Sequence, residues 1–313
     1  MAVLVLTQRL DPTADLVVSE LNRRNVVVFR CDTADFPHEL TLAAHLQGSR
    51  WVGELRNGVR CVALEAISAA YYRRPTRFRF PGLTDAEAAW AEQEAVYGLG
   101  GVLATLPCRW LSHPHRIALA NFKPLQLTVA AEVGLSVPST LVTNDPLAAE
   151  SFAKTSTVYK TLGGPPKLDH QPHSLYTSEV TERECADPSI RGTAHQFQRW
   201  IQKAYEVRLT VVGGRCFAAA IHAGSAAAEL DWRSDYNSLT YSVVALSSDI
   251  EDRAVALVER LGLGFGCLDF VVTPQGEHVF LEINPNGQWA WIEHATGLPI
   301  AAAIADYLEG CPS

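Results

Sequence analysis

Apolar and polar residues alternate along the first thirty positions in a pattern that predicts strand, helix and strand. Residues Ala2 to Leu6 are continuously apolar, as is typical of a buried strand. Thr13 to Asn22 carries apolar residues at helical spacing behind a capping Asp11 or Thr13, and the apolar run Val26 to Phe29 follows. This order predicts one β-α-β unit of a parallel sheet.

Turn signals between apolar runs predict three β-hairpins farther along the chain. The first is centred on Asn57-Gly58 and the second on Gly213-Gly214, both two-residue turns. The third has the four residues Thr273 to Gly276 as its loop. The runs that these turns join are Arg50 to Leu55 with Arg60 to Ala63, Val207 to Val212 with Arg215 to Ile221, and Cys267 to Val272 with His278 to Ile283.

The remaining apolar patterns predict three more helices and five more strands. The helices are Thr84 to Leu103, Ile117 to Val133 and Ile250 to Leu261. The strands are Ala69 to Arg73, Val137 to Thr143, Val158 to Thr161, Ser174 to Thr177 and Ala194 to Trp200. Two polar stretches, Gly163 to Pro166 and Thr181 to Thr193, interrupt the strands in the middle of the chain and are expected to form loops.

The length of 313 residues is enough for two or three lobes with cores of their own, at roughly 100 to 200 residues a domain. The element order predicts an α/β fold whose lobes comprise residues 1–115, 116–200 and 201–313. With 48% hydrophobic and 19% charged residues, the composition is that of a soluble globular protein. We expect functional sites in the clefts between the lobes.

Net charge limits the classes of partner. The 34 acids and 26 bases give a formal charge of -8, which argues against a broad surface for nucleic acid or anionic membranes. The seven cysteines are widely spaced and include no CxxC pair, so we expect buried thiols in a reducing cytoplasm. The N-terminal strand lacks the basic segment of a signal peptide and is too short to span a membrane.

The third hairpin places acids where a core is expected. Its pairing puts Asp269, Glu282 and Asn284 on one face, with diagonal neighbours about 7 to 8 Å apart. Two carboxylates and an amide oxygen suit a hard cation such as Mg²⁺, which is commonly shared with nucleotide phosphates. The alternative is an exposed strand face with incidental acids.

This Asp, followed on the next strand by Glu-x-Asn, resembles the C-terminal signature of the ATP-grasp superfamily. Within it the whole chain is most similar to the graspetide synthetases, which crosslink ribosomal precursor peptides, and specifically to their actinobacterial branch. The N-terminal stretch Tyr71-Tyr72-Arg73-Arg74-Pro75 is part of this resemblance. The resemblance implies an ATP-grasp fold of α/β and α+β lobes, preceded by a pre-ATP-grasp α/β domain.

The resemblance also implies the residues that hold ATP and Mg²⁺. Asp269, Glu282 and Asn284 would be the metal ligands, and Lys123 and Lys160 would reach the nucleotide phosphates. A solvated surface lysine is the alternative for either lysine taken alone.

The segment Phe197-Gln198-Arg199-Trp200-Ile201 resembles the hinge that contacts adenine. Trp200 and Ile201 would sandwich the base, although a strand tryptophan is also common in a core. Gln198 or Arg199 stands where many relatives carry an acid, which leaves the ribose contact to Lys203 or Glu206.

Two arginines and two weaker candidates complete the implied site. Arg208 would point at the γ-phosphate or acyl phosphate, and Arg233, in Asp231-Trp232-Arg233, at the substrate carboxylate or acyl phosphate. Asp231 would accept the proton of the nucleophile. His222 is a second candidate base, although an isolated histidine is more often structural.

The implied activity is an ATP-dependent ligase. It would activate Glu or Asp side chains of a precursor peptide as acyl phosphates, and Thr, Ser or Lys would displace phosphate to give macrocyclic esters or amides. Leader and core peptide would be the partners of a cytoplasmic homodimer, and the loops at 163–164 and 181–193 would act as mobile lids. Arg73, Arg74, Arg77 and Arg79 form a basic cluster, either for an acidic peptide or simply solvated.

Two rival functions remain open at this stage. A small-molecule carboxylate-amine ligase, of the glutathione synthetase or ribosomal-modification glutamate ligase type, would share every ATP residue named above. A peptide-binding scaffold with an inactive ATP-grasp fold is disfavoured because Lys160, Arg208, Asp269 and Glu282 are all present.

Overall fold

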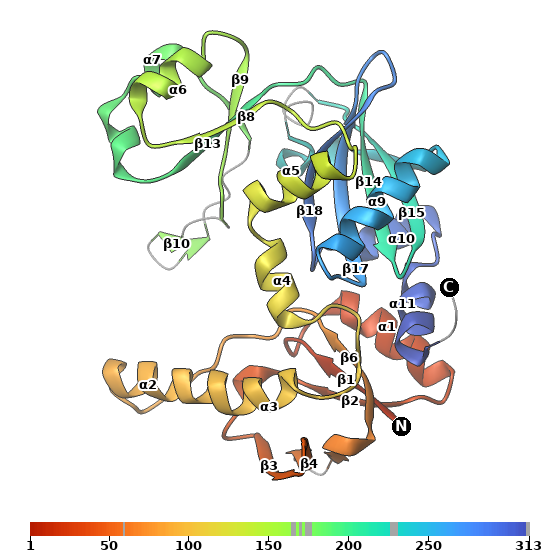
Figure 1. Ribbon diagram of the computed structural model, residues 1–313. Helices are drawn as coiled ribbons and strands as arrows, with labels where there is room; N and C mark the ends of the chain where they lie inside the picture. Colours follow the sequence, from red (N-terminus) through yellow and green to blue (C-terminus); the bar gives the residue numbers. More distant parts are fainter. Residues whose placement is uncertain (59, 164–166, 169–170, 173–176, 226–230, 311–313) are drawn as a thin grey trace.

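A computed structural model of the chain describes residues 1–58, 60–163, 167–168, 171–172, 177–225 and 231–310. The N-terminal domain lies at one end of the molecule, and a small central lobe and a larger C-terminal lobe lie at the other (Figure 1). Each of the three regions expected from the sequence contributes a sheet. Among the described residues, no helix is long and apolar enough to cross a membrane.

The N-terminal domain is built on a parallel sheet in the order β2-β1-β6-β7. The predicted β-α-β unit is confirmed, since β1 and β2 pair in parallel and α1 connects them. An antiparallel sheet, β3-β4-β5, covers part of the same domain. The elements are β1 (Ala2–Leu6), α1 (Pro12–Arg23), β2 (Val27–Cys31), β3 (Leu40–Gln47), β4 (Arg50–Asn57), β5 (Arg60–Ala63), β6 (Ile67–Tyr72), α2 (Asp85–Ala95), α3 (Gly101–Ala104) and β7 (Arg109–Trp110).

The central lobe has a sheet and a core of its own. Its strands lie in the order β12-β9-β13-β8, and α6 and α7 pack on them around the buried Phe197. Its elements are β8 (Thr140–Thr143), α6 (Pro146–Phe152), β9 (Thr157–Lys160), β12 (Ser178–Glu179), α7 (Glu182–Cys185) and β13 (His195–Arg199), with a separate short pair, β10 (Lys167–Leu168) and β11 (Gln171–Pro172). This separate core leaves the lobe attached mainly through the chain segments that enter and leave it.

The C-terminal lobe is a five-stranded antiparallel sheet in the order β16-β15-β14-β17-β18. The predicted turn at Gly213-Gly214 is confirmed, because Val212 pairs with Arg215 and both glycines have positive φ. The elements are α4 (Pro114–Ala120), α5 (Lys123–Glu132), β14 (Tyr205–Val212), β15 (Arg215–His222), β16 (Thr240–Val243), α9 (Ser248–Arg260), β17 (Phe265–Val272), β18 (His278–Asn284), α10 (Ala290–Thr296) and α11 (Ile300–Glu309).

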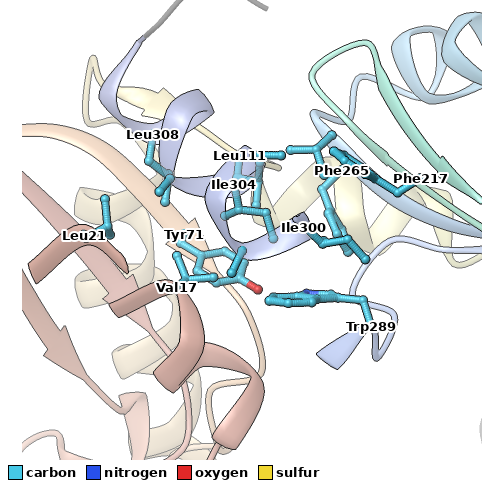
Figure 2. Close-up of a cluster of buried hydrophobic side chains, with 14 of the residues drawn as sticks. Val17, Leu21, Tyr71, Leu111, Phe217, Phe265, Trp289, Ile300, Ile304 and Leu308 are labelled. Atoms are coloured by element: carbon cyan, nitrogen blue, oxygen red, sulfur yellow. The ribbon is translucent and has the colours of Figure 1, made fainter. Parts of the chain in front are cut away.

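Two helical layers cover the faces of this sheet. Helices α4, α5 and α9 share one core with β14, β17 and β18, so residues 114–132 pack on the C-terminal sheet rather than on the central lobe. On the other face, α10 and α11 share a core with α1 and β6 of the N-terminal domain (Figure 2). The N-terminal domain and the C-terminal lobe are therefore joined by one continuous hydrophobic core.

The helix predicted over Ile117 to Val133 is two helices instead. Helix α4 ends at Ala120 and α5 begins at Lys123, with Phe122 in an extended conformation between them. Pro124 has no N–H to donate to the carbonyl of Ala120, which accepts from the side chain of Gln126 at 2.7 Å instead. The proline therefore decides where the second helix begins.

Three other expectations differ from the structure. The helix expected from Thr84 continues to Ala104, but Val96–Gly100 is a π-helical segment. The stretch 181–193, expected as a loop and mobile lid, contains α7 and a 3-10 turn that bury Cys185 and Ile190. Cys61 is exposed rather than buried, and Cys108 and Cys216 are half-buried. Residues 174–176 of the strand expected at Ser174 to Thr177, residues 164–166 of the glycine loop, and Cys311 lie outside the described residues.

Candidate functional site

The acidic hairpin of β17 and β18 has a different register from the predicted one, but its acids still share a face. The loop has five residues, since Val272 pairs with His278. Continued without interruption, this register would set Leu281 opposite Asp269 and turn Glu282 to the other face. A bulge at Leu281 removes the mismatch, so Asp269 pairs with Glu282 and Cys267 with Asn284.

A buried ion pair stands at the centre of this face. Arg208 on β14 is directly opposite Asp269, and its Nη1 donates to both carboxylate oxygens at 2.6 and 2.7 Å. Asn284 Nδ2 donates to Asp269 Oδ2 at 3.2 Å. Burial lowers the pKa of Arg208, but the charge of Asp269, its hydrogen bonds to Arg208 and the other nearby acidic groups together more than reverse this, so the pKa lies above its ordinary value. Arg208 is therefore a permanent cation beside the acids.

Lys123 reaches the same acids from the break between α4 and α5. It is the first residue of α5, not a residue within a longer helix, and its Nζ lies 3.1 Å from Glu282 Oε2. Both side chains are mostly but not fully buried, at 21% and 16% exposure. The helix break thus directs a cation towards the hairpin.

Gln126 is a part of the site that the sequence reading did not identify. Its side-chain amide donates to the carbonyl of Ile283 at 2.9 Å and accepts from the N–H of Ile283 at 3.1 Å. These bonds satisfy the free edge of β18 between Glu282 and Asn284. The sequence offers only a weak signal, a glutamine between Leu125 and Leu127, and the structure shows that this glutamine is 3% exposed.

A cavity of about 570 Å³ lies between the central and C-terminal lobes. The lining residues include most of the predicted site, namely Lys123, Lys160, Gln198, Trp200, Ile201, Lys203, Glu206, Asp231, Asp269, Glu282 and Asn284. Arg208 is not part of the lining and reaches the site through Asp269. Fold and hinge therefore bring together residues that lie up to 161 positions apart, from Lys123 to Asn284.

The hinge segment presents only part of its side chains to the cavity. Gln198 is buried and donates to Thr140 Oγ1 at 3.0 Å, so its amide is already engaged within the central lobe. The guanidinium of Arg199 stacks on Phe152 with 3.8 Å between its Cζ and the ring centroid, and it donates to backbone oxygens of α6 and the following turn. Trp200 and Ile201 remain as the apolar lining of this wall.

Glu206 is a buried acid whose pKa is raised. The pKa of Glu206 is raised to about 7, mainly by burial. The charges of Asp269 and Asp231 also raise it, and the ion pair with Lys203 lowers it. Near neutral pH this carboxyl can exchange a proton or accept hydrogen bonds from a ligand.

Asp231 and Trp232 hold the loop after β15 against the cavity. Asp231 is buried, and its Oδ2 accepts a hydrogen bond from the N–H of Thr177 at 3.0 Å, which links the C-terminal and central lobes. Trp232, to which the sequence reading gave no role, packs on Trp291 with 5.3 Å between ring centroids. The side chain of Arg233 lies outside the described residues. His222 is exposed beside Ser242 and is not among the cavity residues.

The donor set fits a hard divalent cation better than a soft one. Across the described part of the chain there is no group of three or more His, Cys, Asp or Glu that could hold a metal. Two carboxylates and an amide on one sheet face leave positions for water and phosphate oxygens, as Mg²⁺ requires. Lys123, Lys160 and Arg208 add positive charge for an anion in the same cavity.

Comparison with known sequences identifies the N-terminal third first. Residues 2–118 match the family described as MvdD pre-ATP-grasp domain. A stretch of 115 residues is 31% identical to the probable α-L-glutamate ligases of Aliivibrio fischeri (strain MJ11) and Aliivibrio salmonicida (strain LFI1238). That match covers 36% of this chain and 37% of each ligase, so the chain spans little more than a third of these curated relatives.

Solved structures match over the whole chain. The RiPP-associated ATP-grasp ligase of Chryseobacterium gregarium, solved with ADP and a leader and core peptide, has a TM-score of 0.91 and 27% identity, covering 100% of this chain and 98% of that one. The macrocyclase MdnC of Microcystis aeruginosa MRC, solved with the precursor peptide MdnA, has a TM-score of 0.87 and 30% identity, covering 99% and 100%. Because that identity extends over the full length of MdnC in a shared fold, the chain belongs to the graspetide synthetases, a family of ATP-grasp ligases.

Proposed function

We propose that this protein is an ATP-dependent ligase that forms macrocyclic ester or amide crosslinks within a ribosomal precursor peptide. The observation that carries the proposal is the convergence of Lys123 and Lys160 with Asp269 and Glu282 at one cavity between two lobes, with Arg208 paired to Asp269. Phosphate-binding cations beside metal-binding acids are the equipment of phosphoryl transfer.

Asp269, Glu282 and Asn284 would hold Mg²⁺ with ATP in this cavity. When bound, the metal and nucleotide supply the phosphoryl group and neutralise part of its charge. Asn284 now donates its amide N–H to Asp269, so its side chain would have to turn for its oxygen to face a cation. Trp200 and Ile201 would contact the adenine, and Glu206 and Lys203 the ribose.

The residues around the phosphates would act by position and charge. Arg208 and Lys160 would stabilise the negative charge that develops when a substrate carboxylate becomes an acyl phosphate. Arg233 would hold that carboxylate, and Asp231 would accept the proton of the attacking hydroxyl or amine. Closing the two lobes on the cavity would keep water from the acyl phosphate.

A peptide is the proposed substrate because two relatives of similar fold were solved with one. The Chryseobacterium ligase was solved with a leader and core peptide, and MdnC with a precursor peptide. For this chain we propose Glu or Asp as the activated residue and Thr, Ser or Lys as the nucleophile. A cytoplasmic homodimer without nucleic-acid or membrane partners completes the proposal.

The test is incubation with ATP, Mg²⁺ and the peptide of a short neighbouring reading frame rich in Thr, Glu and Asp. Mass spectrometry should find one water lost for each bond formed, with ADP released in equal amount. ATP turnover with free amino acids but not with peptide would overturn the proposal in favour of a small-molecule ligase. The partial match to glutamate ligases makes that the relevant competing activity.

A further inference from the structure

Arg73 is the most deeply buried charged side chain in the junction between the N-terminal domain and the C-terminal lobe. It follows β6 and is 1% exposed, so it is neither a solvated member of the basic cluster nor accessible to an acidic peptide, the two roles considered for that cluster. Its carboxylate neighbour is Asp11, with 4.0 Å between Arg73 Nε and Asp11 Oδ2. A guanidinium is costly to bury without a strong anionic partner, which calls for another reason for its position.

The hydrogen bonds of Arg73 cross from one domain to the other. Its Nη1 donates to the carbonyl of Asn286 at 2.5 Å, and its Nη2 donates to Gln288 Oε1 at 2.6 Å. Thr13, at the start of α1, donates to the same Gln288 oxygen at 2.8 Å. Two residues of the N-terminal domain, Thr13 and Arg73, therefore hold the segment that follows the β17–β18 hairpin, residues 285–289.

That segment in turn contacts Arg208. The carbonyl of Gln288 accepts from Arg208 Nη2 at 3.2 Å, while Arg208 Nη1 holds Asp269. Gly287 packs closely against Cys267 and Arg208, because a Cβ at position 287 would lie 2.5 Å from Cys267 Cβ and 3.0 Å from Arg208 Nη2. The segment thus lies directly against the guanidinium of Arg208.

Trp289 anchors the other end of the segment. Its side chain is fully buried in the core shared by the two domains, where it lies against Tyr71 of β6 (Figure 2). With Arg73 holding Asn286 and Gln288, and Tyr71 packed on Trp289, β6 and the residue after it set the path of residues 286–289. The N-terminal domain can in this way determine where the arginine of the site stands.

We propose that Arg73 is a positioning residue that acts through Gln288 on Arg208, and so on the γ-phosphoryl group; this rests on the proposed function. Arg73 itself does not touch the nucleotide. Its effect is to hold the carbonyl of Gln288 where Arg208 Nη2 needs an acceptor, which leaves Nη1 directed at Asp269 and the phosphates.

The experiment compares two nucleotides that differ by the γ-phosphate. Affinities for Mg·ADP and for Mg²⁺ with a non-hydrolysable ATP analogue are measured by calorimetry on the full chain. The variants are Arg73→Met, Gln288→Leu and the conservative Gln288→Glu, which keeps the acceptor oxygen. Arg208→Met is the reference for loss of the γ-phosphate contact, and Arg23→Met, an exposed arginine on α1, is the matched control.

Arg73→Met and Gln288→Leu should each weaken the ATP analogue about tenfold, the effect of one charge-assisted hydrogen bond, with Mg·ADP affinity within about twofold. Gln288→Glu and Arg23→Met should bind both nucleotides like the wild type. The proposal would be overturned if Arg73→Met and Gln288→Leu lost the same affinity for both nucleotides. It would also be overturned if they lost no affinity for the ATP analogue while Arg208→Met did. If Arg73→Met does not fold, Gln288→Leu decides alone.

Hydrogen exchange without nucleotide separates this inference from the proposed function. The amides of residues 286–289 should exchange faster in Arg73→Met than in the wild type, and no faster in Arg23→Met. A wild-type chain that binds neither nucleotide would refute the proposed function. Unchanged exchange in Arg73→Met would show that Arg73 does not hold residues 286–289 in place, whatever the nucleotide affinities.

Discussion

Glu206 should make the free energy of unfolding depend on pH. Burial raises its pKa from 4.5 to about 7, so between these values the folded state binds more protons than the unfolded state. The free energy of unfolding contributed by Glu206 therefore falls as pH rises from about 4.5 to about 7, and it is constant above that window.

Glu206→Gln should remove this dependence, since glutamine does not titrate. We expect the difference in unfolding free energy, wild type minus variant, to fall by up to about 3 kcal/mol between pH 4.5 and pH 7.5. Urea unfolding at intervals of pH measures it. Two parallel profiles would show that Glu206 titrates at its ordinary pKa in the folded chain.

Glu282 is the residue whose charge matters most to the proposed chemistry. Glu282→Gln keeps the shape but removes the charge of a proposed metal ligand and the partner of Lys123, so crosslinking should fall at least about 100-fold while the fold is retained. ADP release and peptide mass measure activity, and circular dichroism the fold. Glu277→Gln, on the same hairpin, is the control, because the Glu277 carboxylate accepts a hydrogen bond from Ser136 and does not line the cavity. Full activity in Glu282→Gln would mean that the metal site lies elsewhere.

At the scale of elements, β18 is an edge strand that a helix completes. Its pairing with β17 supplies one side, and Gln126 of α5 supplies hydrogen bonds to Ile283 on the other. The bulge at Leu281 and the break before Pro124 are local irregularities, yet both place site residues: one sets Glu282 opposite Asp269, and the other brings Lys123 to Glu282.

Gln126→Leu should therefore cost more than an ordinary change on a helix. It leaves the N–H and C=O of Ile283 and the C=O of Ala120 without this partner, and we expect a loss of roughly 2 to 4 kcal/mol in unfolding free energy. Denaturant unfolding measures the loss, and hydrogen exchange should find the Ile283 amide less protected. Gln93→Leu, on the exposed face of α2, should change little. Similar stability of the two variants would contradict the role given to Gln126.

At the scale of the whole molecule, the chain forms two bodies that are unequal in extent, and the core shared by α1, β6 and α11 holds the larger one together. One runs from α1 and β6 through α11 to β15 and β17, and so joins the N-terminal domain to the C-terminal lobe (Figure 2). The central lobe has its own small core around Phe197. The cavity lies between these bodies, so the relative position of the central lobe controls its width.

Ile304→Ala should loosen the larger body as a unit. Ile304 is fully buried in the shared core, and its truncation should cost about 2 to 5 kcal/mol. Hydrogen exchange should rise in β1 and β17 together while β13 keeps its protection. Phe197→Ala should instead raise exchange in β13 and leave β1 and β17 protected. Faster exchange in β1 alone would show that the two domains unfold independently.

Local pattern determined much of this protein. Alternation along β18 placed Glu282 and Asn284 on one face, and Gly213-Gly214 defined a hairpin, because strand faces and tight turns depend on neighbours a few positions away. The resemblance of these motifs to ATP-grasp ligases then indicated the family that full-length similarity confirmed.

Only the tertiary structure decided which polar residues are buried and what they hold. In the sequence, Arg73 belongs to a basic cluster that either binds an acidic peptide or is solvated, and Gln126 is one residue of a predicted helix, but their partners lie 213 and 157 positions away. Burial depends on which surfaces pack together, and no local pattern records that. The bulge at Leu281 likewise changes the register that the five-residue loop sets, so that Asp269 and Glu282 come to share a face.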